Sequence, residues 1–300
     1  MAVLITRIED LAHDWFSLGV IAGMHAAAND VGGRVEISGT RETRPHALAQ
    51  RLTETRPDAL AFLSCSPEYL ALLNVSHSLG FPTILANTAF VRPGTSSVVC
   101  EDNAQGTRLS VDHLVDHGHE RIGLVLNRWP EPWVFERHQS FEQSLADRGC
   151  DPMACPAGWI DVGYDIEGAS PALEEQDRQC ADRLLAYIER VKPTAIVAGA
   201  QTVSRAFGRL VAEGRLSVPG DVSVVCFDQH PSNATWYGTQ PTTIELPLNA
   251  IGRQLFDVAE QLRRDFNPDY DPASNAGPHG IIQRRLPCTL KPGNTVETRA

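Results

Sequence analysis

Three histidines lie near the end of one expected helix and are the first candidates for chemistry in this chain. His113 and His117 are four residues apart, and His119 follows them. Residues at this spacing share one face of a helix, so the pair could chelate zinc. Histidines near a helix carboxyl end are also favoured by the negative end of the helix dipole. We favour this second interpretation and predict neither a metal site nor a cofactor.

The motifs of the common enzyme classes are missing from the sequence. The two lysines, Lys192 and Lys291, do not follow a suitable glycine, so there is no P-loop. No G-x-G-x-x-G follows an expected strand, and neither G-x-S-x-G nor C-x-x-C occurs. The seven cysteines are scattered, which is typical of reduced thiols in a cytosolic protein. We predict that the chain is cytoplasmic and is not an enzyme.

Charge and hydropathy exclude further classes. The 26 basic and 37 acidic residues give a net charge of −11, and an acidic surface repels phosphate. These residues should therefore not form a general nucleic-acid-binding surface. No run of about 18 apolar residues suggests a membrane span, and the first residues lack the layout of a secretory signal.

Strand and helix patterns alternate along the first hundred residues. Each predicted strand leads into a helix, and such units join through right-handed crossovers into a parallel sheet. The expected strands are 2–6, 34–38, 59–63 and 83–86, and the expected helices are 15–31, 45–55 and 67–79.

The pattern restarts near residue 98 and gives a second α/β half. A strand and helix at 242–264, a loop at 265–279 and a strand at 280–287 follow it, and 291–300 should be a loose tail. Two such lobes predict a ligand cleft at the carboxyl ends of their strands. The second half contains expected strands at 121–126, 195–198 and 222–227, helices at 104–117, 134–148, 176–191 and 201–213, and a loop at 149–175.

Several segments, in their order along the chain, resemble one protein family. Residues 101–122 read EDNAQGTRLSVDHLVDHGHERI, and residues 218–228 read VPGDVSVVCFD. Shorter segments agree, namely PTAI at 193–196, RHQSF at 137–141 and PTTI at 241–244. Together these residues are similar to the effector-binding domain of the lactose/galactose-repressor family of bacterial transcription regulators.

The resemblance implies a periplasmic-binding-protein-like type I fold, with two doubly wound parallel-sheet lobes joined by three crossovers. The N-terminal lobe would comprise residues 1–100 and 243–270, and the C-terminal lobe 101–241 and 278–290. The crossovers would lie near 99–103, 240–243 and 270–280.

The resemblance also implies a function. A small effector, such as a sugar, sugar derivative or nucleoside, would bind in the cleft of a homodimer. Operator DNA would be read only by an N-terminal helix-turn-helix, which we do not find in this chain.

The resemblance further implies polar ligand-binding residues. Arg137 corresponds to the family's ligand-binding arginine, whose guanidinium can donate several hydrogen bonds to neighbouring hydroxyls. Asp228 corresponds to its cleft aspartate, and Asn87 follows the fourth strand, where the family often has a polar ligand contact.

Aromatic side chains are a second group of candidates. Trp159 occupies a place where the family can stack a ring on the ligand, and a flat ring suits the apolar face of a sugar. Trp15 and Phe16 match the loop after the first strand, and Trp133 lies shortly before Arg137. Packing in a core explains each of these rings equally well.

The sequence departs from the family pattern at several positions around the expected pocket. Ala200 and Gln201 replace an Asn-Asp pair, Leu246 replaces a polar residue, and Asn127 and Ser140 each replace a glycine. We therefore expect an unusual pocket that is more apolar and aromatic. A free-standing sugar or solute receptor is the alternative function, and an enzyme that uses the cleft is a third.

Overall fold

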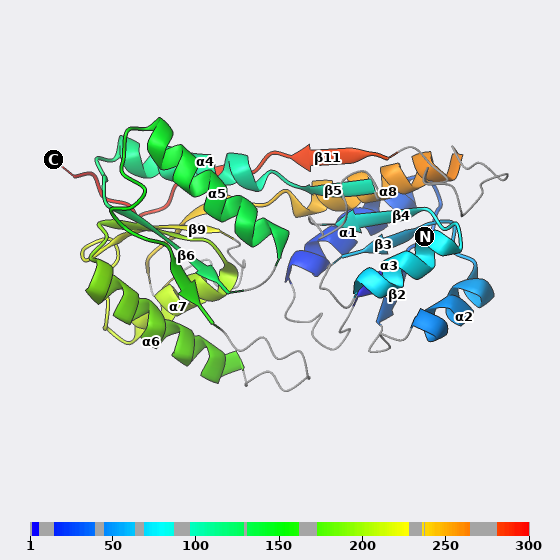
Figure 1. Cartoon of the computed structure of the whole chain (residues 1–300), viewed down its shortest axis with the longest axis horizontal. Coiled ribbons are helices and arrows are strands. Elements are labelled where there is room, and N and C mark those ends of the chain that lie inside the picture. The colour runs from blue at the N-terminus through cyan, green and yellow to red at the C-terminus, as the bar shows by residue number, and fades with distance from the viewer. Residues whose placement is uncertain are drawn as a thin grey trace. The chain divides into compact units, whose positions relative to one another are not determined.

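The chain divides into two compact units. The computed structural model describes residues 2–5, 15–39, 45–63, 69–86, 97–128, 131–161, 173–227, 236, 238–264 and 281–299. Unit 1 comprises Met1–Glu101 and Pro247–Leu286, and unit 2 comprises Asp102–Leu246 and Pro287–Ala300 (Figure 1). The chain therefore passes between the units three times.

Unit 1 is built on a parallel sheet of six strands in the order β11-β5-β4-β3-β1-β2. Helices α1 (Trp15–Asp30) and α8 (Leu248–Arg264) pack against each other, and so do α2 (Pro45–Thr55) and α3 (Tyr69–Ser78). The strands are β1 (Ala2–Ile5), β2 (Glu36–Gly39), β3 (Leu60–Phe62), β4 (Thr83–Ala86), β5 (Ser97–Glu101) and β11 (Gln283–Leu286).

Two glycines allow α1 and α8 to approach each other closely. A Cβ atom on Gly23 would lie 2.1 Å from the carbonyl oxygen of Asn249, and one on Gly252 would lie 2.0 Å from that of Val20. No side chain larger than hydrogen fits at such distances, so backbone packs directly on backbone. This contact joins the first helix of unit 1 to a helix that enters the unit more than 200 residues later.

Unit 2 has a six-stranded sheet in the order β12-β10-β9-β8-β6-β7, with β12 antiparallel and the other strands parallel. Helices α4 (Asn103–Asp116) and α5 (Pro132–Asp147) cover one face, and α6 (Leu173–Val191) and α7 (Gln201–Ala212) cover the other (Figure 1). The strands are β6 (Ile122–Asn127), β7 (Gly158–Ile160), β8 (Ala195–Ala198), β9 (Ser223–Phe227), β10 (Thr242–Glu245) and β12 (Thr289–Lys291).

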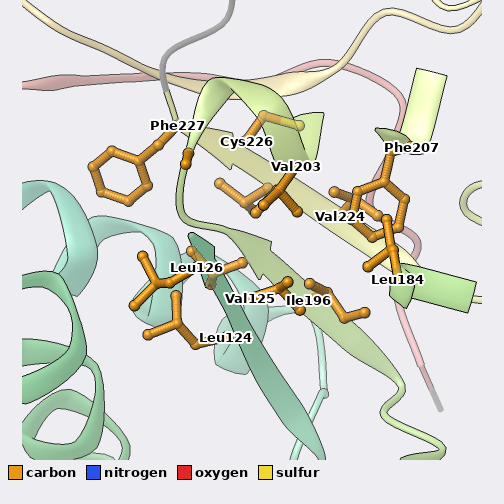
Figure 2. Packing of buried hydrophobic residues seen from close by; sticks show 14 of the residues in the cluster. Leu124, Val125, Leu126, Leu184, Ile196, Val203, Phe207, Val224, Cys226 and Phe227 are labelled. Atoms are coloured by element: carbon orange, nitrogen blue, oxygen red, sulfur yellow. The ribbon is translucent and has the colours of Figure 1, made fainter. Parts of the chain in front are cut away.

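The core of unit 2 is formed by apolar side chains on both faces of its three central strands. Strands β6, β8 and β9 are buried along their whole length, as expected for parallel strands covered by helices on both sides. Figure 2 shows Val125 and Ile196 beside Leu184 and Phe207 from the covering helices, with Phe227 at the carboxyl end of β9. The core thus holds the carboxyl ends of three neighbouring strands in fixed register.

The structure corrects several expectations at the level of elements. Strand β7 lies inside the expected loop 149–175. Strand β11 lies within the strand expected at 280–287, and a further strand that we did not expect, β12, follows it. Strand β11 pairs with β5 in unit 1, although we expected 278–290 in the C-terminal lobe. Strand β10 pairs with β9 in unit 2, although we expected residues from 243 onward in the N-terminal lobe.

The segment expected to be a loose tail is part of unit 2. The buried hydroxyl of Thr295 donates to the carbonyl of Val224 at 2.6 Å and accepts from the Thr242 amide at 2.8 Å. The amide of Val224 donates to the carbonyl of Thr295, and the amide of Arg299 donates to that of His117. Residues 295–299 are therefore held by hydrogen bonds to β9 and to the end of α4.

Candidate functional site

The carboxyl edge of the unit 2 sheet has the topology of a ligand site. Strand β6 lies between β7 and β8, so the chain leaves β6 toward one side of the sheet and returns on the other. Loops that follow such neighbouring strands diverge, and ligands of open α/β sheets bind at this switch point. The side chains that the structure brings to this edge come from β6, β9 and the starts of α4, α5 and α7.

Arg137 is the central polar residue at this edge. It lies on α5, is only 2% exposed, and donates to at least two acceptors that the structure describes. Its Nε atom donates to the Oδ1 atom of Asn103 at 2.7 Å, and its Nη1 atom donates to the carbonyl of Gly199 at 2.8 Å. The arginine thereby joins α4 and α5 to the turn between β8 and α7.

Two aromatic rings flank the guanidinium of Arg137. Its Cζ atom lies 4.2 Å from the ring centroid of Phe227 and 4.7 Å from that of Trp133. Cations are attracted to aromatic faces, and this attraction is stronger when the pair is desolvated. The indole Nε1 atom of Trp133 donates to the carboxylate of Glu131, which fixes the orientation of the ring. The predicted site residues Trp133 and Arg137 therefore lie in contact.

Asn103 begins α4, directly after the N-cap residue Asp102. It is fully buried, and besides accepting from Arg137 it donates through Nδ2 to the carboxylate of Glu136 at 3.2 Å. Asn103 thus bridges a cation and an anion that are neighbours on α5. We did not single out this residue from the sequence, although it lies within the family-like segment 101–122.

A second polar pair lies at the end of β6. The hydroxyl of Thr202 donates to the Oδ1 atom of Asn127 at 2.6 Å, and both side chains are buried. The Nδ2 atom of Asn127 is buried and has no hydrogen-bond partner in the part of the chain that the structure describes. Asn127 replaces the glycine of the family pattern, so this amide is a polar group that the pattern does not contain.

Trp159 presents an aromatic surface at the edge strand of the sheet. Its side chain is 38% exposed, and its ring centroid lies 5.2 Å from that of His138 on α5. Phe135, on the same helix, is 55% exposed. Trp159 and Phe135 are therefore exposed aromatic side chains on β7 and α5.

The other predicted site residues lie in unit 1 or outside the described residues. Trp15 and Phe16 form the first turn of α1 in unit 1, where both are half-buried. Asn87 and Asp228 lie outside the described residues, so their roles as ligand contacts stay predictions.

The three histidines near the end of α4 have structural contacts. The Nδ1 atom of His117 lies 2.7 Å from the carbonyl of His113, and burial lowers the pKa of His113 below its ordinary value. His119 is buried between the hydroxyl of Thr194 and the carbonyl of Glu297. No group of three or more potential metal ligands occurs among the described residues.

The cysteines that the structure describes are all free, and Cys65 lies outside the described residues. Cys150 is half-buried, and burial raises the pKa of its thiol. No helix within the described ranges is long and apolar enough to cross a bilayer. The buried free cysteines are Cys100, Cys155, Cys180, Cys226 and Cys288.

Comparison with known families decides the classification of the chain. A family profile described as "Periplasmic binding protein-like domain" matches residues 111–296. The chain belongs to this family. The matched range begins in α4 and contains β6 to β12 with the helices between them, and so includes the edge described above apart from the first residues of α4.

The curated relatives are repressors of the type that the sequence suggested. The HTH-type transcriptional repressor PurR of Aliivibrio fischeri is 24% identical over 227 residues, which are 76% of this chain and 64% of the relative. PurR of Photobacterium profundum is 25% identical over 218 residues, 72% of this chain and 60% of the relative. This member of the family therefore spans less than two thirds of these relatives' length.

Solved structures agree with the fold. The complex of the transcriptional regulator CelR with cellobiose has a TM-score of 0.78 at 18% identity and covers 98% of this chain and 83% of that one. A LacI family regulator from Enterococcus faecium with bound ribose has a TM-score of 0.75 at 17% identity, covering 100% and 99%. The expected periplasmic-binding-protein-like type I fold and the resemblance to repressor effector domains are confirmed.

Proposed function

We propose that this chain is the effector-binding part of a bacterial transcription regulator. The similarity to HTH-type repressors over about three quarters of the chain carries the proposal. In this proposal operator DNA is bound by a helix-turn-helix that corresponds to the part of the relatives outside the match. We further propose that the protein is a cytoplasmic homodimer.

The proposed effector is a sugar, a sugar derivative or a nucleoside. An arginine fixed at a strand edge can offer donors to hydroxyl oxygens, and exposed rings such as Trp159 can stack on an apolar sugar face or a base. Structural neighbours have been crystallised with cellobiose and with ribose. Hydrogen-bond acceptors for the effector would come from Asn87 and Asp228, as the family resemblance implies.

A ligand panel tests the effector class. We would measure thermal unfolding of the chain with sugars, sugar phosphates, nucleosides and nucleobases, and then titrate each hit by calorimetry. A ligand at about 100 times its Kd stabilises by roughly 2.7 kcal/mol, which moves Tm by several degrees. Trp159→Ala should weaken binding, whereas Met153→Ala, which removes another exposed apolar side chain of unit 2, should not. A panel without a hit would reject this effector class.

A second experiment tests the regulatory role. The complete gene product should bind operator DNA, and the effector found in the panel should change that affinity. A gene product that binds the effector and lacks any DNA-binding segment would instead be a stand-alone receptor. Recovery of the effector chemically unchanged after prolonged incubation is expected, and turnover would reveal an enzyme.

A further inference from the structure

We infer that Asn103 is a positioning residue: it holds the Arg137 guanidinium at the effector edge and ties it to the places where the chain passes between the units. Its effect on ligand affinity rests on the proposed function, but its effect on Arg137 does not. The argument starts from the contacts of Asn103 itself.

Asn103 holds Arg137 through the Nε donor of the guanidinium. A hydrogen bond to Nε at 2.7 Å restricts rotation of the whole group, and the second bond, from Nη1 to Gly199, sets its reach. The rings of Phe227 and Trp133 then limit movement out of the plane. A donor group fixed in this way loses less conformational entropy when it binds a ligand.

The side-chain type at position 103 is well matched to this task. The amide of Asn103 accepts from Arg137 and at the same time donates to Glu136. A carboxylate would keep the first bond but would place a negative charge beside Glu136. An apolar residue would lose both bonds, and an unsatisfied buried partner is costly.

The first turn of α4 connects Asn103 to the passages between units. The first passage occurs between residues 101 and 102, and the third between 286 and 287. Gln105 binds the backbone of Cys288 twice, since its Nε2 atom donates to the carbonyl at 3.2 Å and its Oε1 atom accepts from the amide at 2.8 Å. The thiol of Cys288 also lies 3.5 Å from the carbonyl of Asp102.

Gly106 allows the first turn of α4 to pack closely against Phe227, Ile244 and Cys288. A Cβ atom there would lie 3.1 Å from Phe227, 3.1 Å from Ile244 and 3.2 Å from the thiol of Cys288. Ile244 belongs to β10, which ends shortly before the second passage at residue 246. A displacement of Arg137 would therefore act through Asn103 on the first turn of α4, which packs against Phe227, Ile244 and Cys288.

Arginine side-chain NMR tests the positioning role without any ligand. In the wild-type chain the Nε–H of Arg137 should give a resolved signal that exchanges slowly with water, and Arg137→Lys identifies it by its loss. Asn103→Leu, which fills a similar volume without an acceptor, should abolish the slow exchange. Asn103→Asp should retain it, because the acceptor is kept. Slow exchange in Asn103→Leu, or its loss in Asn103→Asp, would overturn the inference, and Asn103→Ala repeats the first comparison if the leucine variant does not fold.

Calorimetry then measures the consequence for the effector. With a hit from the panel, Asn103→Leu should raise Kd at least about tenfold, and Asn103→Asp should bind more tightly than Asn103→Leu. Gln143→Ala, on the exposed side of α5, is the matched control and should leave Kd unchanged. Equal affinities of the wild type and Asn103→Leu would refute the positioning role. If the wild-type chain binds nothing in the panel, the proposed effector class fails, while the NMR result still decides the role of Asn103.

Discussion

The guanidinium of Arg137 packs on the ring of Phe227, the last residue of β9, at 4.2 Å from the ring centroid. We predict that Arg137→Ala destabilises the chain by about 3 kcal/mol or more, because it leaves a cavity and removes the donors to Asn103 and Gly199. Urea unfolding measures the loss. Arg183→Ala, which removes an exposed arginine of α6, is the control, and equal losses in the two variants would contradict a structural role for Arg137.

The Thr202–Asn127 pair predicts a non-additive result. Thr202→Val removes the donor to Asn127, whose Nδ2 atom has no partner among the described residues, and should cost about 1–3 kcal/mol. The double variant Thr202→Val, Asn127→Leu removes both polar groups and should recover much of this loss. Unfolding free energies of the four proteins give the coupling energy. Simple additivity would show that the pair does not interact.

The burial of His119 predicts that the free energy of unfolding decreases in mildly acidic solution. Burial, as the largest cause, lowers the pKa of His119 below its ordinary value of 6.5, although its bond to the Glu297 carbonyl acts in the opposite direction. The unfolded chain therefore binds more protons than the folded chain, so stability rises with pH in this range and is lost as pH falls below about 6.5. Burial lowers the pKa of His113 as well, so the two effects add.

The measurement is the unfolding free energy between about pH 7.5 and 5. His119→Gln should flatten its pH dependence, since one of the responsible groups is gone. A substitution of the exposed His46 serves as the control. An unchanged pH dependence in His119→Gln would mean that this histidine does not contribute.

The close α1–α8 contact predicts that a single added methyl group strongly destabilises unit 1. Gly252→Ala would place a Cβ atom 2.0 Å from the Val20 carbonyl, so the helices must separate. Overpacking typically costs about 1–3 kcal/mol, and we expect at least the upper end of this range because the obstacle is backbone. Thermal unfolding should show the loss in unit 1. Arg264→Ala at the exposed end of α8 is the control, and a Tm equal to wild type in Gly252→Ala would contradict the close packing.

Most of the fold was predictable because local sequence patterns indicate its helices and strands. The long helices and buried strands have clear apolar periodicity and end at glycines such as Gly80 and Gly118, both with positive φ. Strand β7 was missed because it is short and lies in a segment rich in Gly, Pro and Asp. The assignment of β11 and β12 to different units could not be read from sequence, since it depends on pairing with β5 and β10 far away in the chain.

The candidate site was predictable where one residue carried the signal, and not where pairs of residues did. Arg137 was singled out by a family motif, and the structure places it with Trp133. Its contacts with Asn103 and Gly199 span 34 and 62 residues, so only folding reveals them. A polar residue directly after the cap Asp102 is the sequence signal that could have identified Asn103.

The position of Thr295 beside β9 has a consequence for how the protein is made. Its hydroxyl and backbone complete hydrogen bonds of Val224 and Thr242, which are synthesised 71 and 53 residues earlier. During translation these groups of β9 and β10 therefore lack these partners until residue 295 has been added. A chain that ends before residue 295 would leave these groups of the unit 2 sheet without these partners, and cellular quality control should recognise and degrade it.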